Sequence, residues 1–393
     1  MNSNLHEWLN LLIRWGHFLA GIMWIGTSLY FVWMDSSFKP LAEPKKGVDG
    51  EVWMVHGGNF YHVEKRRFGP GEMPSLLHWF KWEATLTWLT GFMLLIVVYY
   101  MTSGAYLVDA QVKNLSPGLA SLIGLGVIFG GWIFYDLLLR SPLAKSKWVN
   151  VVGLFLTAAI IYFLTHTFSG RGAFIHLGAM FGTMMVLNVW VHILPNQQAI
   201  IEASNAGNEP NYDLGKIAKT RSMHNSYMTL PVLFIMISNH FPSTFAHSNN
   251  WLVLILIVLM GALVRHVMIS AKYWPLAPAL ACLVALVSMT YVKAARGLPE
   301  NDSENSKVHF FQINHILQNR CVQCHSRFPT DSVFTVAPGG VVFDTPADIQ
   351  QWSTRINERA VQQKTMPLAN KTQMLDEERI LLGKWISQGA RVE

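Results

Sequence analysis

Long apolar runs alternate with polar segments over the first 291 residues of the chain. Eight of these runs are long enough to predict helices that cross a bilayer, which takes about 20 residues each. They lie at 10–32, 80–101, 117–139, 148–168, 173–195, 226–241, 250–270 and 275–292. After Tyr291 the chain becomes polar and stays so. The pattern predicts an all-α fold, an eight-helix transmembrane bundle followed by a small soluble domain.

This change of character divides the chain into three predicted parts. Residues 1–297 form a polytopic membrane domain, 298–306 a polar linker, and 307–393 the soluble domain. Within the soluble domain, apolar residues recur at helical spacing in 307–320 and in 376–389. We therefore expect one helix near the start of this domain and another close to its end.

Composition and charge support a membrane protein. Half of the residues (51%) are hydrophobic and only 14% are charged, which is unusual for a soluble enzyme. Lysine and arginine mark the cytoplasmic loops of membrane proteins. Thirteen of them lie in the loops on one predicted side, whereas Lys113 and Arg171 are the two on the other. The net charge of +6 thus reflects topology rather than nucleic-acid binding. Both termini are expected outside, with the lipid bilayer as a partner.

The strongest chemical motif is Cys321-Val322-Gln323-Cys324-His325. Two thiols at this spacing form thioethers to the haem vinyl groups, and the adjacent imidazole of His325 ligates the iron. The alternatives are a disulfide or half of a zinc site, but the remaining cysteine, Cys282, lies in the last apolar run. We expect one covalent haem c in a class I cytochrome c domain. Bacteria attach this haem in the periplasm, so the motif and the charge pattern both indicate the inner membrane with a periplasmic tail.

The second iron ligand should come from the same polar tail. Met366, about 40 residues beyond the motif, is the expected axial ligand, and Pro367 would stiffen the loop that presents its sulfur. Met374 is the rival. A thioether ligand raises the reduction potential of a haem, so the tail is expected to accept electrons.

Histidines inside the apolar runs fall into two tiers. Ionisable groups in a membrane are costly, so each is a candidate for function. A possible intramembrane haem b would take its ligands from the outer tier: His17, His166, His176 and His240. The alternative is that neighbouring helices or the headgroup zone satisfy each histidine separately.

Two polar segments on the predicted inner side are unusual. The first, His56 to Lys65 (HGGNFYHVEK), contains a Gly-Gly turn between polar and aromatic residues, and it includes His62. The second, 221–227 (RSMHNSY), carries Arg221 and His224 into the sixth apolar run. Simple anchoring at the membrane interface does not explain the Gly-Gly segment. Residues 78–83 (HWFKWE) and 188–197 (NVWVHILPNQ) are polar patches on the same predicted side, so all four patches can meet in one pocket.

These segments resemble a known family, the bacterial membrane-bound urate hydroxylases that end in a cytochrome c domain. The likeness also covers 77–91, 170–190 and 221–242, and with the CVQCH tail it extends along nearly the whole chain. It implies oxidation of urate to 5-hydroxyisourate with water as the oxygen source. Electrons would pass to the covalent haem and on to a respiratory acceptor without release of hydrogen peroxide.

A pocket for the planar urate anion needs cationic donors and a base. Lys65 and Arg221 would pair with the anion, and His56, His62 or His224 would take up protons. A direct electron transfer from this pocket to the outer haem would cross most of a bilayer core of about 30 Å. That distance is the reason for expecting a haem b between them.

Two other functions stay open. The chain can be the electron-transfer cytochrome c subunit of a membrane dehydrogenase, which would not need an elaborate inner pocket. It can also handle haem or copper, because residues 17–30 are similar to the opening helix of membrane protoporphyrinogen oxidases and of membrane copper proteins. Such a protein would not need a high-potential cytochrome as its tail.

Overall fold

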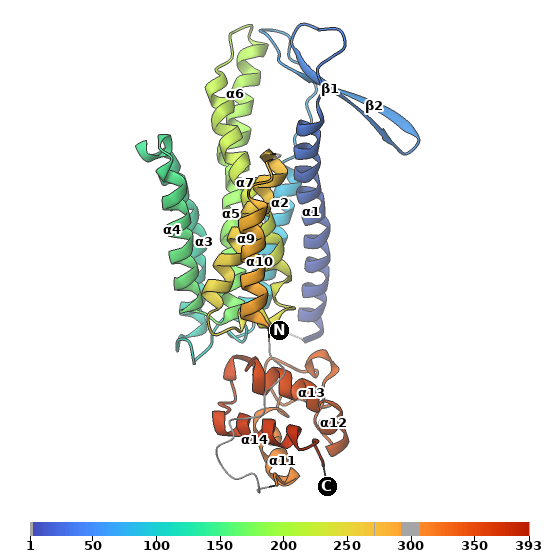
Figure 1. Cartoon of the computed structure of the whole chain (residues 1–393), viewed down its shortest axis with the longest axis vertical. Helices are drawn as coiled ribbons and strands as arrows, with labels where there is room; N and C mark the ends of the chain where they lie inside the picture. The colour runs from blue at the N-terminus through green and yellow to red at the C-terminus, as the bar shows by residue number, and fades with distance from the viewer. Residues whose placement is uncertain (1–2, 271, 292–306, 393) are drawn as a thin grey trace.

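The structure is a computed structural model that describes residues 3–270, 272–291 and 307–392. The predicted linker, 298–306, and the predicted domain boundary at 297 lie outside the described residues. The fold is mostly helical, with 66% helix and 5% strand. Figure 1 shows a long helix bundle with a β-hairpin at one end and a small helical domain at the other, here called the hairpin end and the tail end. The first helix begins at the tail end.

The bundle consists of nine helices among the described residues, and the longest connection, between the first two, contains the hairpin. They are α1 (Ser3–Ser37), α2 (Trp82–Leu95), α3 (Pro117–Arg140), α4 (Trp148–Thr165), α5 (Gly170–Leu187), α6 (Leu194–Asn205), α7 (Tyr212–Ser238), α9 (Asn250–Ser270) and α10 (Leu276–Thr290). The shorter elements are η2 (Pro142–Lys145), α8 (Pro242–Phe245) and two π-helical turns, η1 (Ile96–Tyr100) after α2 and η3 (Asn188–Ile193) between α5 and α6. A helix therefore lies on each of the eight apolar runs.

Six helical segments among the described residues are long and apolar enough to cross a membrane. The other two runs lie in α7, whose first half is polar, and in α10, which has only 15 residues. The fifth run is longer than expected, since helical structure continues from Gly170 to Asn205. A membrane protein is thus supported, while the count of eight crossings stays a prediction.

Helix α5 forms the centre of the bundle. Its residues Phe174, Leu177 and Met180 are almost fully buried in the main core. Small residues let its neighbours come close, as is common in membrane bundles. A Cβ atom on Gly178 would lie 2.7 Å from Ile235 of α7, so a larger residue there would push the helices apart.

The expectation of a purely helical fold is wrong for residues 48–66. They form an antiparallel hairpin of β1 (Val48–His56) and β2 (Asn59–Arg66), with His56 opposite Asn59. Gly57 and Gly58 both have positive φ, as the tight two-residue turns of hairpins require. The Gly-Gly turn was predictable from the sequence, whereas the two strands that it joins were not predicted.

The tail is a separate small helical unit with its own core. It comprises α11 (Phe310–Arg320), η4 (Pro338–Gly340), α12 (Pro346–Gln351), α13 (Ser353–Ile356), η5 (Asn357–Gln362), η6 (Leu368–Asn370) and α14 (Asp376–Ser387). Leu317 of α11 and Trp385 of α14 are buried in one cluster. Arg320 donates to both carboxylate oxygens of Glu378 at 3.0 Å, which joins these two helices. They occupy the two segments where the sequence predicts helices.

Candidate functional site

A buried polar network lies in the hairpin half of the bundle, with Asp136 of α3 at its centre. One carboxylate oxygen accepts from Arg221 Nη2 at 2.7 Å and from His192 Nε2 at 2.6 Å. The other oxygen accepts from Arg140 Nε at 2.7 Å. Asp136 is 6% exposed and Arg221 4%. Both oxygens of the Asp136 carboxylate thus accept hydrogen bonds. Because two guanidinium groups surround this one carboxylate, the network carries net positive charge.

The network continues through Asn188, which is fully buried in the π-helical turn η3. Its Oδ1 accepts from Arg221 at 3.3 Å, and its Nδ2 donates to Asn225 and to the Tyr135 hydroxyl, both at 2.9 Å. The Tyr135 hydroxyl also hydrogen-bonds Nδ1 of His224 at 3.0 Å, so the two side chains can exchange a proton. Single π-helical turns of this kind are frequent at functional sites.

The three candidate residues of the hairpin have different surroundings. His62 bonds Glu51 at 2.8 Å, and Lys65 bonds Asp35 at 2.7 Å. His56 is exposed next to the turn. The ion pairs of His62 and Lys65 are partly exposed to solvent. Figure 1 shows the hairpin projecting away from the bundle.

The structure therefore divides the predicted inner pocket in two. Arg221 and His224 lie together in the buried network, whereas His56, His62 and Lys65 lie on the hairpin with other partners. Asn188 and Tyr135 connect Arg221 to His224. Asn188 belongs to one of the polar patches expected in the inner pocket, whereas Tyr135, within the third apolar run, was not singled out from the sequence.

Among the outer-tier histidines, His176 of α5 is fully buried. Its Nδ1 donates to the carbonyl of Gly172 at 2.7 Å, and its Nε2 accepts from the Tyr100 hydroxyl at 2.9 Å. A Cβ atom on Gly124 would lie 2.5 Å from Nε2. The backbone of α3 thus packs directly against the imidazole, and both ring nitrogens are already bonded.

The other three histidines of this tier have separate neighbours. His17 donates from Nδ1 to the carbonyl of Thr87 at 3.0 Å, and His166 stacks on Tyr162. His240 is exposed at the end of α7. These contacts do not present two histidines to one haem, so the donor set expected for an intramembrane haem b is not assembled among these residues. Within the described ranges no three His, Cys, Asp or Glu side chains form a metal-binding group.

The CVQCH motif forms a turn directly after α11. His325 N–H donates to the Cys321 carbonyl at 3.0 Å, which places both thiols and the imidazole on one short segment. Burial raises the pKa of Cys321 to about 12 and that of Cys324 to about 11, as expected for thiols on an apolar surface. Nδ1 of His325 bonds the Val341 carbonyl at 3.0 Å, and burial lowers the pKa of this imidazole. His325 is thus neutral with Nε2 free, the state that an iron ligand requires.

The loop that carries Met366 is held by Arg379. This arginine is buried and donates from Nη1 to the Met366 carbonyl at 2.7 Å. The Met366 side chain packs at the edge of the tail core together with Cys321, whereas Met374 is 2% exposed inside that core. This donor set fits a covalently attached c-type haem, with His325 and Met366 as its ligands.

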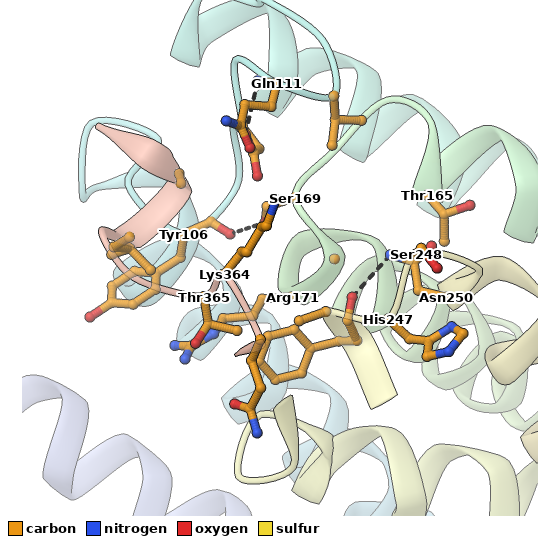
Figure 2. Close-up of a pocket in the computed structure, with 18 of the residues that line it drawn as sticks. Tyr106, Gln111, Thr165, Ser169, Arg171, His247, Ser248, Asn250, Lys364 and Thr365 are labelled. Carbon is orange, nitrogen blue, oxygen red and sulfur yellow. Dashed lines mark hydrogen bonds between the residues drawn. The ribbon is translucent and has the colours of Figure 1, made fainter. Parts of the chain in front are cut away.

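A cavity of about 430 Å³ lies where the tail meets the bundle. Figure 2 shows Tyr106, Arg171 and His247 of the bundle around it, facing Lys364 and Thr365 of the tail. The last two residues directly precede Met366. The cavity contains none of the hairpin or network residues, so it marks the joint between the two parts rather than the candidate substrate site.

Aromatic rings extend from this joint into the bundle. Phe334 of the tail lies 6.1 Å from Tyr106, which lies 6.2 Å from Tyr99. Tyr99 in turn lies 6.3 Å from the ring of His176. The tail and the interior of the bundle are thus connected by neighbouring rings at the tail end.

Comparison with known proteins gives one match. The family model described as "Urate oxidase N-terminal" matches residues 3–295, which covers the whole described bundle and the hairpin but not the tail. No curated protein and no solved structure matches the chain. With about three quarters of its length inside the match, the chain belongs to the urate oxidase N-terminal family.

Proposed function

We propose that the protein oxidises urate to 5-hydroxyisourate in a bacterial inner membrane and passes the electrons to a covalent haem c in its tail. The family match over residues 3–295 carries this proposal, because it covers the entire bundle in which the buried polar network lies. Urate and water would give 5-hydroxyisourate, two protons and two electrons. The reaction thus needs an anion site, a proton acceptor and an electron acceptor.

Tyr135 and His224 are suited to accept a proton. A proton that reaches the Tyr135 oxygen would displace the phenolic hydrogen along the 3.0 Å bond to Nδ1 of His224. In this proposal Arg221 and Asp136 keep the network in place, and His224 acts as the base.

The tail supplies the electron acceptor. Cys321 and Cys324 would hold the haem, and His325 and Met366 would ligate its iron. When bound, the group would supply a one-electron acceptor, so the two electrons from urate would leave in succession towards a respiratory acceptor. An eight-helix membrane domain with a periplasmic class I cytochrome c domain is part of the same proposal, with the lipid bilayer around the bundle.

The test is the anaerobic addition of urate to the purified full-length protein. The c-haem α-band should appear with two electrons taken up per urate, and in air no hydrogen peroxide should accumulate. If the haem is bound but urate leaves the α-band unchanged, the protein is an electron-transfer subunit of another enzyme. A pyridine haemochrome spectrum of the same sample shows whether a haem b accompanies the haem c.

A further inference from the structure

One cation in the bundle interior has no anion beside it. Arg265 of α9 is 0% exposed, and its Nε has no hydrogen-bond partner. Its remaining contacts are weak: Nη2 donates to Ser28 Oγ at 3.3 Å, and Nη1 approaches the Met268 sulfur at 3.9 Å. In the part of the chain that the structure describes, no carboxylate lies within ion-pair distance of it. Arg221, in contrast, is fully paired.

A carboxylate in the same half of the bundle is also incompletely bonded. Glu83 lies in the first turn of α2, and its Oε2 is buried without a hydrogen-bond partner. A buried polar atom without a partner costs about 1–3 kcal/mol, and more if the group is charged. Two such groups of opposite charge are therefore an unusual feature of one helix bundle.

Contacts along α1 place Arg265 and Glu83 beside the same stretch of this helix. Ser28 shares one face of α1 with Trp24 and Phe31, because these positions are separated by one helical turn each. Phe31 contacts the ring of Phe80 at 5.2 Å, just before α2. Trp24 packs in one cluster with Ala84, in the first turn of α2.

Glu83 lies between these two contacts in sequence, and Arg265 reaches the same stretch of α1 through Ser28. The incompletely bonded guanidinium and carboxylate therefore both border the same two turns of α1, residues 24–31, in the hairpin half of the bundle. They do not pair with each other, since no ion pair joins them. A ligand that both accepts from a guanidinium and donates to a carboxylate would satisfy both.

We propose that Arg265, Ser28 and Glu83 form the anion-binding part of the urate site. This inference rests on the proposed function and names the residues that recognise its substrate. Urate is a planar anion whose ring oxygens accept hydrogen bonds and whose ring N–H groups donate them. The guanidinium binds an oxygen edge, and the carboxylate accepts from a ring N–H.

The experiment measures urate binding separately from turnover. The purified full-length protein is kept reduced with dithionite, so that urate binds without being oxidised, and its thermal unfolding is followed with increasing urate. Wild-type protein should be stabilised by urate. Arg265→Gln should unfold at the same or a higher temperature without urate, because it removes a buried unpaired charge, and it should bind urate at least 10-fold more weakly.

Matched variants complete the test. Arg265→Lys keeps the charge and should retain part of the affinity, and Glu83→Gln should weaken it. Arg14→Gln, which replaces an exposed arginine of α1 bonded to Asn10, should bind urate like wild type. If Arg265→Gln does not fold, Ser28→Ala and Arg265→Lys replace it, with several-fold weaker binding expected for both.

Two results would overturn the inference in distinguishable ways. If urate reduces the wild-type haem and Arg265→Gln keeps the wild-type affinity, the anion site lies elsewhere and the proposed function stands. If urate neither stabilises the reduced wild-type protein nor reduces its haem, the proposed function fails and this site assignment fails with it.

Discussion

The hairpin and the buried network of the bundle contain the same kinds of side chain in opposite environments. On the hairpin, His62 and Lys65 pair with carboxylates at the surface, where an ion pair is worth about 0–1 kcal/mol. In the network, Asp136 and Arg221 are almost completely buried, and removing one partner of such a pair costs about 3–5 kcal/mol. Residue type alone thus does not identify a site. The burial of a charged pair decides how strongly the stability of the protein depends on it.

The largest expected difference between the two regions is in stability. Asp136→Asn leaves two guanidinium groups and His192 around a neutral side chain, so it should lower the free energy of unfolding by about 3–5 kcal/mol. Unfolding of the detergent-solubilised protein measures this loss. Glu51→Gln, which removes the partner of His62 on the hairpin, is the matched control and should change the free energy by less than about 1 kcal/mol. Equal losses in both variants would contradict the comparison.

The next difference is in the rate of urate oxidation. His224→Gln should slow the urate-driven reduction of the haem by about 10²–10⁴-fold, the usual contribution of a general base. His56→Gln and His62→Gln should stay within about threefold of wild type, because neither contacts the network. Stopped-flow absorbance at the α-band measures all three rates. If the hairpin variants lose as much as His224→Gln, the substrate site is on the hairpin.

Removal of the whole hairpin is a broader test of the same difference. Replacing residues 48–66 with a short Gly-Ser linker should leave the unfolding temperature of the bundle within a few degrees of wild type. The reason is that β1 and β2 pair mainly with each other. A bundle that no longer folds without the hairpin would show that the two regions depend on one another.

The sequence was sufficient where the signal is local. Apolar runs of bilayer length predict the helices of the bundle, and a helix lies on each of them. The contiguous CVQCH motif lies on one turn, and the haem site that it indicates stays a prediction. The partners of Arg221 were not predictable in this way. Asp136 lies 85 positions earlier in the chain, and nothing local tells which faces of α3 and α7 meet. The unpartnered state of Arg265 is likewise a property of packing, visible only once the neighbouring helices are known.

The smallest expected effect is electrostatic and confined to the hairpin. Lys45 bonds the Glu64 carboxylate at 2.9 Å, and this bond lowers the pKa of Glu64. Because the folded pKa lies below the unfolded one, the pair stabilises the hairpin above the unfolded pKa and stops doing so as the pH falls through the folded value. Lys45→Ala should raise the pKa of Glu64, which an NMR titration of its carboxyl carbon measures. Since the pair is solvated, the unfolding of the bundle should not change, and a shift there would show that the hairpin charges act on the interior after all.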